Sequence, residues 1–175
     1  AVTLIPDENL GVVVLTNGMK SPFMAATYYA IDKFLGIETR DWSAEYLERT
    51  NNRQREDTRI SSRKEKRVTG TKPSVVLEDY TGVYQSDIYG EIKIILDSDQ
   101  LRMEFEHSPY LAATLGHWHY DVWEIKWDNK HAWFSFGTVK FNMDNNLKVT
   151  GMDFGVPNND IFFEELKPYK LKAVE

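Results

Sequence analysis

Two histidines and an aspartate stand at alternate positions near the middle of the sequence: His117, His119 and Asp121. On a β-strand, residues two positions apart point to the same side, so this spacing would bring two imidazoles and a carboxylate together. Such a set could bind a divalent metal, since neutral imidazole prefers zinc or a similar ion. The alternative is a polar outer face of a strand, or structural hydrogen bonds at a barrel rim. It is favoured because no third His or Cys stands nearby. We expect no cofactor.

A search for a nucleophile finds one match to the Ser-x-x-Lys spacing, from Ser61 to Lys64. In serine acyltransferases this spacing places a lysine base one helical turn from the serine. Here the neighbouring residues are nearly all charged, and a solvated site of this kind does not activate a lysine by burial. The sequence has no Gly-x-Ser-x-Gly or His-Glu-x-x-His motif, and it contains no cysteine. We therefore expect no catalytic residue in this chain.

Aromatic residues make up 13% of the chain, with 5 Trp, 9 Tyr and 9 Phe. Eight-stranded barrels can be solid or can hold one small ligand, so these rings could line a cavity for an apolar or sugar-like molecule. The candidate ligand-binding residues are Tyr84, Tyr89, Trp118, Tyr120, Trp123 and Trp133. The simpler interpretation is an aromatic core, or a face that packs on another domain.

The first element that could position these residues is a strand–helix segment over residues 1–36. Val2–Ile5 and Gly11–Thr16 predict a hairpin, and a helix follows, with Ser21 as its N-cap and Gly36 as its stop. The strand from Val12 to Leu15 is apolar on both faces, which is typical of a sheet covered on both sides. We expect residues 1–36 to pack on the chain's own barrel or to pair with a second copy as a homodimer.

Residues 37–78 are charged and poor in apolar side chains. Between Glu38 and Arg67 the sequence has nine Lys or Arg and seven Asp or Glu. This mixture predicts a solvated helix or a flexible linker rather than a binding arm. The segment from Thr69 to Pro73 predicts a break before the next domain.

Residues 79–175 have a period of two, which predicts short antiparallel strands. The change of phase near Val122 predicts a turn or a bulge, and the change at Gly137 predicts a bulge. The expected strands are 82–86, 89–97, 100–106, 111–122, 123–127, 132–143, 147–154 and 160–167. A mainly β meander of this kind closes into a barrel or a sandwich.

The overall charge and hydropathy exclude two classes of protein. The net charge is −6 with a pI of about 5.3, which argues against a nucleic-acid protein because these usually carry a basic patch. No apolar run approaches the roughly 18 residues that predict a membrane span.

The sequence resembles a known family in several places. Residues 4–17, LIPDENLGVVVLTN, resemble the final strands of the penicillin-binding-protein and class C β-lactamase-related serine hydrolases. Residues 79–166 resemble the domain of unknown function often found C-terminal to those hydrolases, a lipocalin-like antiparallel barrel. The matching segments are LEDYTGVY at 77–84, YG at 89–90, HWHYDVWE at 117–124, VKF at 139–141 and IFF at 161–163.

This resemblance implies three parts: the end of a hydrolase domain over 1–36, a charged linker over 37–78 and an eight-stranded lipocalin-like barrel over 79–175. The family's Ser-x-x-Lys, Tyr-x-Asn and Lys/His-x-Gly elements would all precede Ala1, so the natural partner is the catalytic domain of the parent hydrolase. The implied role is a non-catalytic accessory domain that packs near the parent's active site and shapes substrate access. The alternative is a ligand-binding module with an aromatic cavity. The implied location is periplasmic or extracellular.

Overall fold

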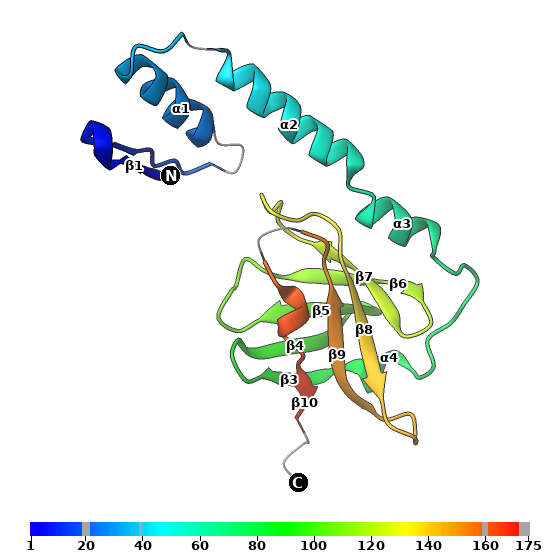
Figure 1. The fold of residues 1–175 in the computed structure, drawn as a ribbon. Coiled ribbons are helices and arrows are strands. Elements are labelled where there is room, and N and C mark those ends of the chain that lie inside the picture. Colours follow the sequence, from blue (N-terminus) through cyan, green and yellow to red (C-terminus); the bar gives the residue numbers. More distant parts are fainter. Residues whose placement is uncertain (19–21, 39, 159–160, 172–175) are drawn as a thin grey trace. The chain divides into compact units, whose positions relative to one another are not determined.

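The computed structural model describes residues 1–18, 22–38, 40–158 and 161–171. They belong to two compact units, the hairpin unit Ala1–Thr58 and the barrel unit Arg59–Glu175. Figure 1 shows the strands and helices of each unit. We describe the two units separately.

The hairpin unit contains a two-stranded antiparallel sheet and two helices. Strand β1 (Val2–Ile5) pairs with β2 (Leu10–Val13), and the one-turn 3-10 helix Pro6–Glu8 joins them. The helices are α1 (Phe23–Phe34) and α2 (Trp42–Glu56). The stacked rings of Tyr28 and Trp42, whose centroids lie 4.8 Å apart, join the two helices. The predicted N-cap Ser21 lies outside the described residues.

The barrel unit is a closed antiparallel sheet in the order β10-β3-β4-β5-β6-β7-β8-β9. Helices α3 (Arg59–Glu65) and α4 (Leu77–Tyr80) precede it. The strands are β3 (Gly82–Ser86), β4 (Gly90–Asp97), β5 (Gln100–Phe105), β6 (Ala113–His119), β7 (Val122–Trp127), β8 (Thr138–Met143), β9 (Val149–Gly155) and β10 (Tyr169–Lys170). The prediction of a mainly β chain, with an eight-stranded antiparallel barrel after a hairpin and helices, is confirmed.

The period of two places one face of each strand in the core. In β4, Ile92 and Ile94 are buried while Lys93 between them is exposed. The β4–β5 turn is tight because Ser98 and Asp99 both adopt positive φ, 49° and 63°, as the two central residues of a type I′ hairpin turn do. Buried residues of the strands, α4 and the 3-10 helix form one continuous hydrophobic cluster, so the barrel interior is occupied by its own side chains.

Three predictions about individual elements can be compared with the structure. The turn or bulge predicted near Val122 is confirmed: Tyr120 has a φ of 47°, and the β6–β7 register shifts between His117 and His119. The bulge at Gly137 is wrong, because this glycine lies in the irregular segment before β8. A Cβ at Gly137 would approach Val156 Cγ2 to 2.7 Å, so close packing explains the glycine. Among the described residues, no helix is long and apolar enough to cross a membrane.

The predicted strand 160–167 is also wrong for the residues that the structure describes. Its centre is a 3-10 helix, Phe163–Glu165, which turns Phe163 into the core. The strand that closes the barrel is the two-residue β10, which pairs with both β3 and β9. Pro168, directly before β10, has no N–H to donate, so it bonds to β9 only through its carbonyl oxygen, which accepts from the Met152 N–H at 2.9 Å.

Candidate functional site

Two of the six candidate ligand-binding residues lie in the barrel core. Tyr84 is fully buried and Trp123 is 4% exposed. The Tyr84 hydroxyl donates a hydrogen bond to the Tyr80 carbonyl oxygen at 2.6 Å, and burial raises the pKa of Tyr84 above its ordinary value. The ring of Trp123 meets the edge of Tyr80 at 5.5 Å between centroids. Both side chains therefore contribute to packing and are not exposed to a ligand.

Two more candidates, Trp118 and Tyr120, lie at the β6–β7 hairpin together with the proposed metal ligands. There they meet residues 59–76, which we call the strap: helix α3 and the extended segment after it. Arg67 donates from Nε to the Trp118 carbonyl oxygen at 3.0 Å, and its guanidinium lies 4.5 Å from the centroid of the Trp118 ring. The Tyr120 N–H donates to Thr71 Oγ1 at 3.0 Å.

The strap and Tyr80 of α4 also hydrogen-bond to side-chain atoms of His119 and Asp121. The backbone N–H of Val68 donates to His119 Nδ1 at 3.1 Å. Asp121 accepts from the Ser74 N–H at 2.9 Å, the Ser74 hydroxyl at 2.7 Å and the Tyr80 hydroxyl at 2.5 Å. These bonds attach the strap to the hairpin, so the carboxylate and one imidazole have a structural role.

The protonation of the same two groups follows from these contacts. Burial lowers the pKa of His119, and the positive charge of Arg67 lowers it further. Burial raises the pKa of Asp121, but the hydrogen bonds from Tyr80 and Ser74 lower it by more, so it lies below its ordinary value. The lowered pKa of His119 favours a neutral imidazole, and the lowered pKa of Asp121 favours an ionised carboxylate.

The alternation that suggested a metal site is interrupted in the structure. His117 hydrogen-bonds through Nε2 to the Tyr120 carbonyl oxygen at 2.9 Å, and the register shift separates it from His119. Within the described ranges, no group of three or more His, Cys, Asp or Glu could hold a metal ion.

The Ser-x-x-Lys sequence lies in α3, which rests on the outside of the barrel. Arg63 donates to Thr138 Oγ1 at 3.0 Å and also to the Gly155 carbonyl oxygen. The Lys64 ammonium lies 5.3 Å from the centroid of the Phe136 ring. The basic side chains of α3 therefore hold the strap on the barrel.

The last two candidates, Tyr89 and Trp133, lie at the mouth of the barrel, which we call the mouth groove. The connections β3–β4, β5–β6 and β7–β8 meet residues of the segment 161–166 there, around a groove of about 730 Å³. Its lining residues are Ile88, Tyr89, Phe105, His107, Ser108, Pro109, Tyr110, Leu111, His131, Trp133, Phe134, Ile161, Phe162, Phe163 and Leu166. Phe105, Phe134, Phe163 and Leu166 also belong to the buried cluster, so the groove lies above a filled interior.

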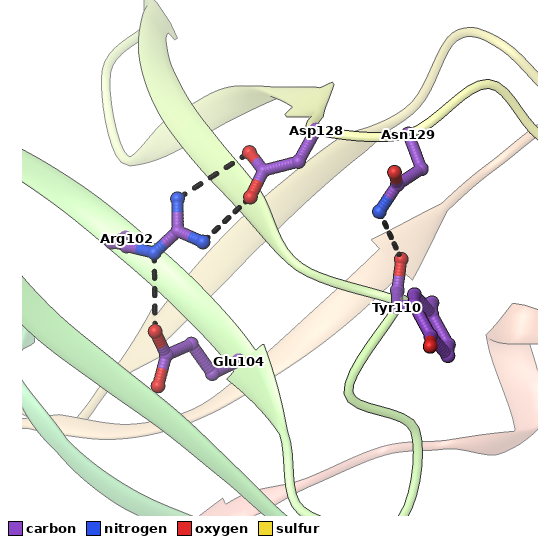
Figure 2. A network of polar contacts seen from close by, with 5 residues as sticks. All are labelled: Arg102, Glu104, Tyr110, Asp128 and Asn129. Atoms are coloured by element: carbon purple, nitrogen blue, oxygen red, sulfur yellow. Dashed lines mark hydrogen bonds and ion pairs between the residues drawn. The ribbon is translucent and has the colours of Figure 1, made fainter.

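Polar contacts hold two of the connections that form the mouth groove. Figure 2 shows Arg102 of β5 between Glu104 and Asp128, with Nη2 to Asp128 Oδ2 at 2.6 Å and Nε to Glu104 Oε1 at 3.1 Å. Next to Asp128, the Asn129 side chain donates to the Tyr110 carbonyl oxygen at 3.0 Å. The β5–β6 connection is thus tied to the segment that follows β7.

Sequence reasoning missed most of the groove. Ile88, Tyr110 and Phe162 are exposed by 77%, 80% and 65%. A signal was available for Ile88 and Tyr110, which stand between predicted strands, so no strand face would bury them. Phe162 gave no such signal, because it lies inside the predicted strand 160–167. Of the six candidate aromatic residues, the structure brings only Tyr89 and Trp133 together in this groove.

Comparisons with known proteins give the following similarities. No curated protein matches the chain. The crystal structure of the C-terminal domain of the penicillin-binding protein Rv0907 is similar to 61% of this chain, covering 94% of that domain at 18% identity with a TM-score of 0.46. Residues 66–168, more than half of the sequence, match the family described as a domain of unknown function, DUF3471. The chain belongs to this family.

Proposed function

We propose that this chain is a non-catalytic C-terminal accessory part of a β-lactamase-related serine hydrolase. In this proposal the hairpin unit completes the sheet of the catalytic domain. The barrel unit, which is lipocalin-like in its up-and-down strand order, packs near the active site and shapes substrate access. The location would be that of the parent enzyme, periplasmic or extracellular.

The observation that carries this proposal is the exposed apolar face of the hairpin. Val2, Leu4 and Val13 are exposed by 69%, 69% and 62%, and Val2 pairs directly with Val13. The alternate residues Thr3 and Val12 are half-buried, and α1 contacts β2.

A two-stranded hairpin is marginally stable on its own, and an apolar sheet face normally packs against another element. The hairpin therefore has the properties of a sheet fragment that further polypeptide covers. Its sequence resemblance to the final strands of the hydrolases supports the proposal that this polypeptide is the catalytic domain.

The strap supports an accessory role for the barrel. It is the segment through which the chain passes from the hairpin unit to the barrel, and its contacts run from Arg63 to Ser74. These contacts hold the strap against the barrel, so in this proposal the barrel carries its own attachment to the rest of the parent enzyme.

The test compares the full gene product with the same product lacking residues 66–171. We would measure kcat/KM for a small ester, p-nitrophenyl acetate, and for a larger peptidyl ester with the same leaving group. Removal of the barrel is expected to leave kcat/KM for the small ester within about twofold. It should change kcat/KM for the large ester by tenfold or more, which is about 1.4 kcal/mol of transition-state free energy. Equal effects on both substrates, or none on either, would contradict the role in access.

A further inference from the structure

We propose that the mouth groove is a binding site for an uncharged small molecule that carries an aromatic ring. This proposal does not depend on the hydrolase parent, because it concerns the barrel unit alone. The groove has a volume of about 730 Å³, within the roughly 300–1,000 Å³ of small-molecule sites. Barrel mouths are among the usual places for such sites.

The absence of Asp, Glu, Lys and Arg among the described lining residues favours a neutral ligand. A charged ligand would lose its hydration without meeting an opposite formal charge from these residues, which is unfavourable. The polar atoms available for orientation are the Tyr89 and Tyr110 hydroxyls, the Ser108 hydroxyl and the imidazole rings.

The aromatic content of the lining favours a ring over an alkyl chain. Tyr89 and Trp133 are exposed by 44% and 48% at the rim, above the buried rings of Phe134 and Phe163, which meet edge to face at 5.0 Å. Aromatic rings gain an orientation-dependent attraction from such partners beyond the burial of area. An alkyl chain of equal area gains only the burial.

His131 adds a hydrogen-bonding group to the wall. Its ring stacks on Phe134 at 4.5 Å between centroids, and its Nε2 atom is buried with no hydrogen-bond partner among the described residues. An unpartnered buried nitrogen is unfavourable. A rotation of the imidazole toward the groove would let one polar group of the ligand satisfy this atom.

The experiment titrates the full chain with N-phenyl-1-naphthylamine, a neutral probe whose fluorescence rises in apolar sites. The matched anionic probe, 8-anilinonaphthalene-1-sulfonate, has the same rings and an added sulfonate. We expect saturable binding of the neutral probe at one site, at least tenfold tighter than that of the anionic probe. The neutral competitor 2-naphthol should displace the probe at a concentration at least fivefold lower than 1-decanol does.

Three variants locate the site. Trp133→Ala should weaken binding about tenfold, equal to about 1.4 kcal/mol, and Tyr110→Ala about threefold. Tyr120→Ala is the matched control, because Tyr120 is 55% exposed at the β6–β7 hairpin outside the groove. Far-ultraviolet circular dichroism checks that each variant is folded, and the exposed Tyr110 and Tyr120 can be removed without opening the core.

Four results would overturn the proposal. They are the absence of saturable binding by the neutral probe, equal or tighter binding of the anionic probe, displacement by 1-decanol as effective as by 2-naphthol, and an equal loss of affinity in Tyr110→Ala and Tyr120→Ala.

Discussion

Replacing Asp121 by alanine should destabilise the barrel by about 3 kcal/mol. The carboxylate accepts two hydrogen bonds from Ser74 and one from the hydroxyl of Tyr80, whose side chain is fully buried. The bonds from Ser74 are exposed, so water can replace them and each contributes about 0.5 kcal/mol. The bond from Tyr80 to a charged acceptor contributes about 1.5–3 kcal/mol, and its loss leaves the hydroxyl without this acceptor.

Urea unfolding followed by tryptophan fluorescence measures this loss, because four of the five Trp lie in the barrel unit. Tyr80→Phe removes the hydroxyl that donates to Asp121 and should cost about 1.5 kcal/mol. The double variant Asp121→Ala/Tyr80→Phe should then lose about 1–2 kcal/mol less stability than the sum of the two single losses, because both substitutions remove the same bond. Additive losses, or a loss below about 1 kcal/mol for Asp121→Ala, would refute the reasoning.

The contribution of Asp121 should also depend on pH. Its pKa is below the ordinary value in the folded chain, so ionised Asp121 stabilises the fold. This stabilisation is complete above the unfolded pKa of about 3.9 and is lost as the pH falls through the lower folded value. The difference in stability between the wild-type chain and Asp121→Ala should therefore be constant from pH 5 to 8 and shrink below about pH 4.

Three further predictions concern His119, the barrel seam and the hairpin. The pKa of His119 is lowered, so the contribution of neutral His119 to stability should be full above about pH 6.5 and decrease as the pH falls below this value. His119→Gln should remove this decrease from the pH profile of urea unfolding. An unchanged profile would contradict the prediction. Gly151→Ala would place a Cβ 2.7 Å from the Pro168 carbonyl oxygen and should cost about 1–3 kcal/mol of unfolding free energy, whereas a neutral effect would show that the seam adjusts. In sedimentation velocity the chain alone should self-associate through the exposed hairpin face. Leu4→Glu should reduce this self-association, while the barrel control Leu147→Glu should not. Equal effects of the two substitutions would argue against association through this face.

Most of the barrel was predictable because its strands alternate. Buried Ile92 and Ile94 follow one phase, and the turn at Ser98 and Asp99 separates it from the next strand. The closing strand was not predictable, because β10 has two residues and two residues carry no periodic signal. Ile161 and Phe162 resemble the middle of a strand, yet Phe162 is exposed because the chain turns there into a 3-10 helix.

The candidate site was predictable only in part. Alternation shows which residues share a face, but it does not show that Tyr84 and Trp123 face a filled core while Tyr89 reaches the mouth. The structural role of Asp121 depends on Ser74, 47 residues earlier in the chain. One of the two bonds from Ser74 comes from its backbone N–H, which every residue except proline has. The spacing of residues in the sequence therefore does not predict this pairing.

The most direct measurement of the central claim is covalent labelling by a fluorophosphonate, read by intact mass and peptide mapping. The chain of residues 1–175 and the full gene product would be labelled side by side under the same conditions. The proposal predicts one adduct on the full product, at a serine that precedes Ala1, and none on the chain alone. An adduct on a serine within residues 1–175, such as Ser61, would contradict the assignment of this chain as a non-catalytic accessory part.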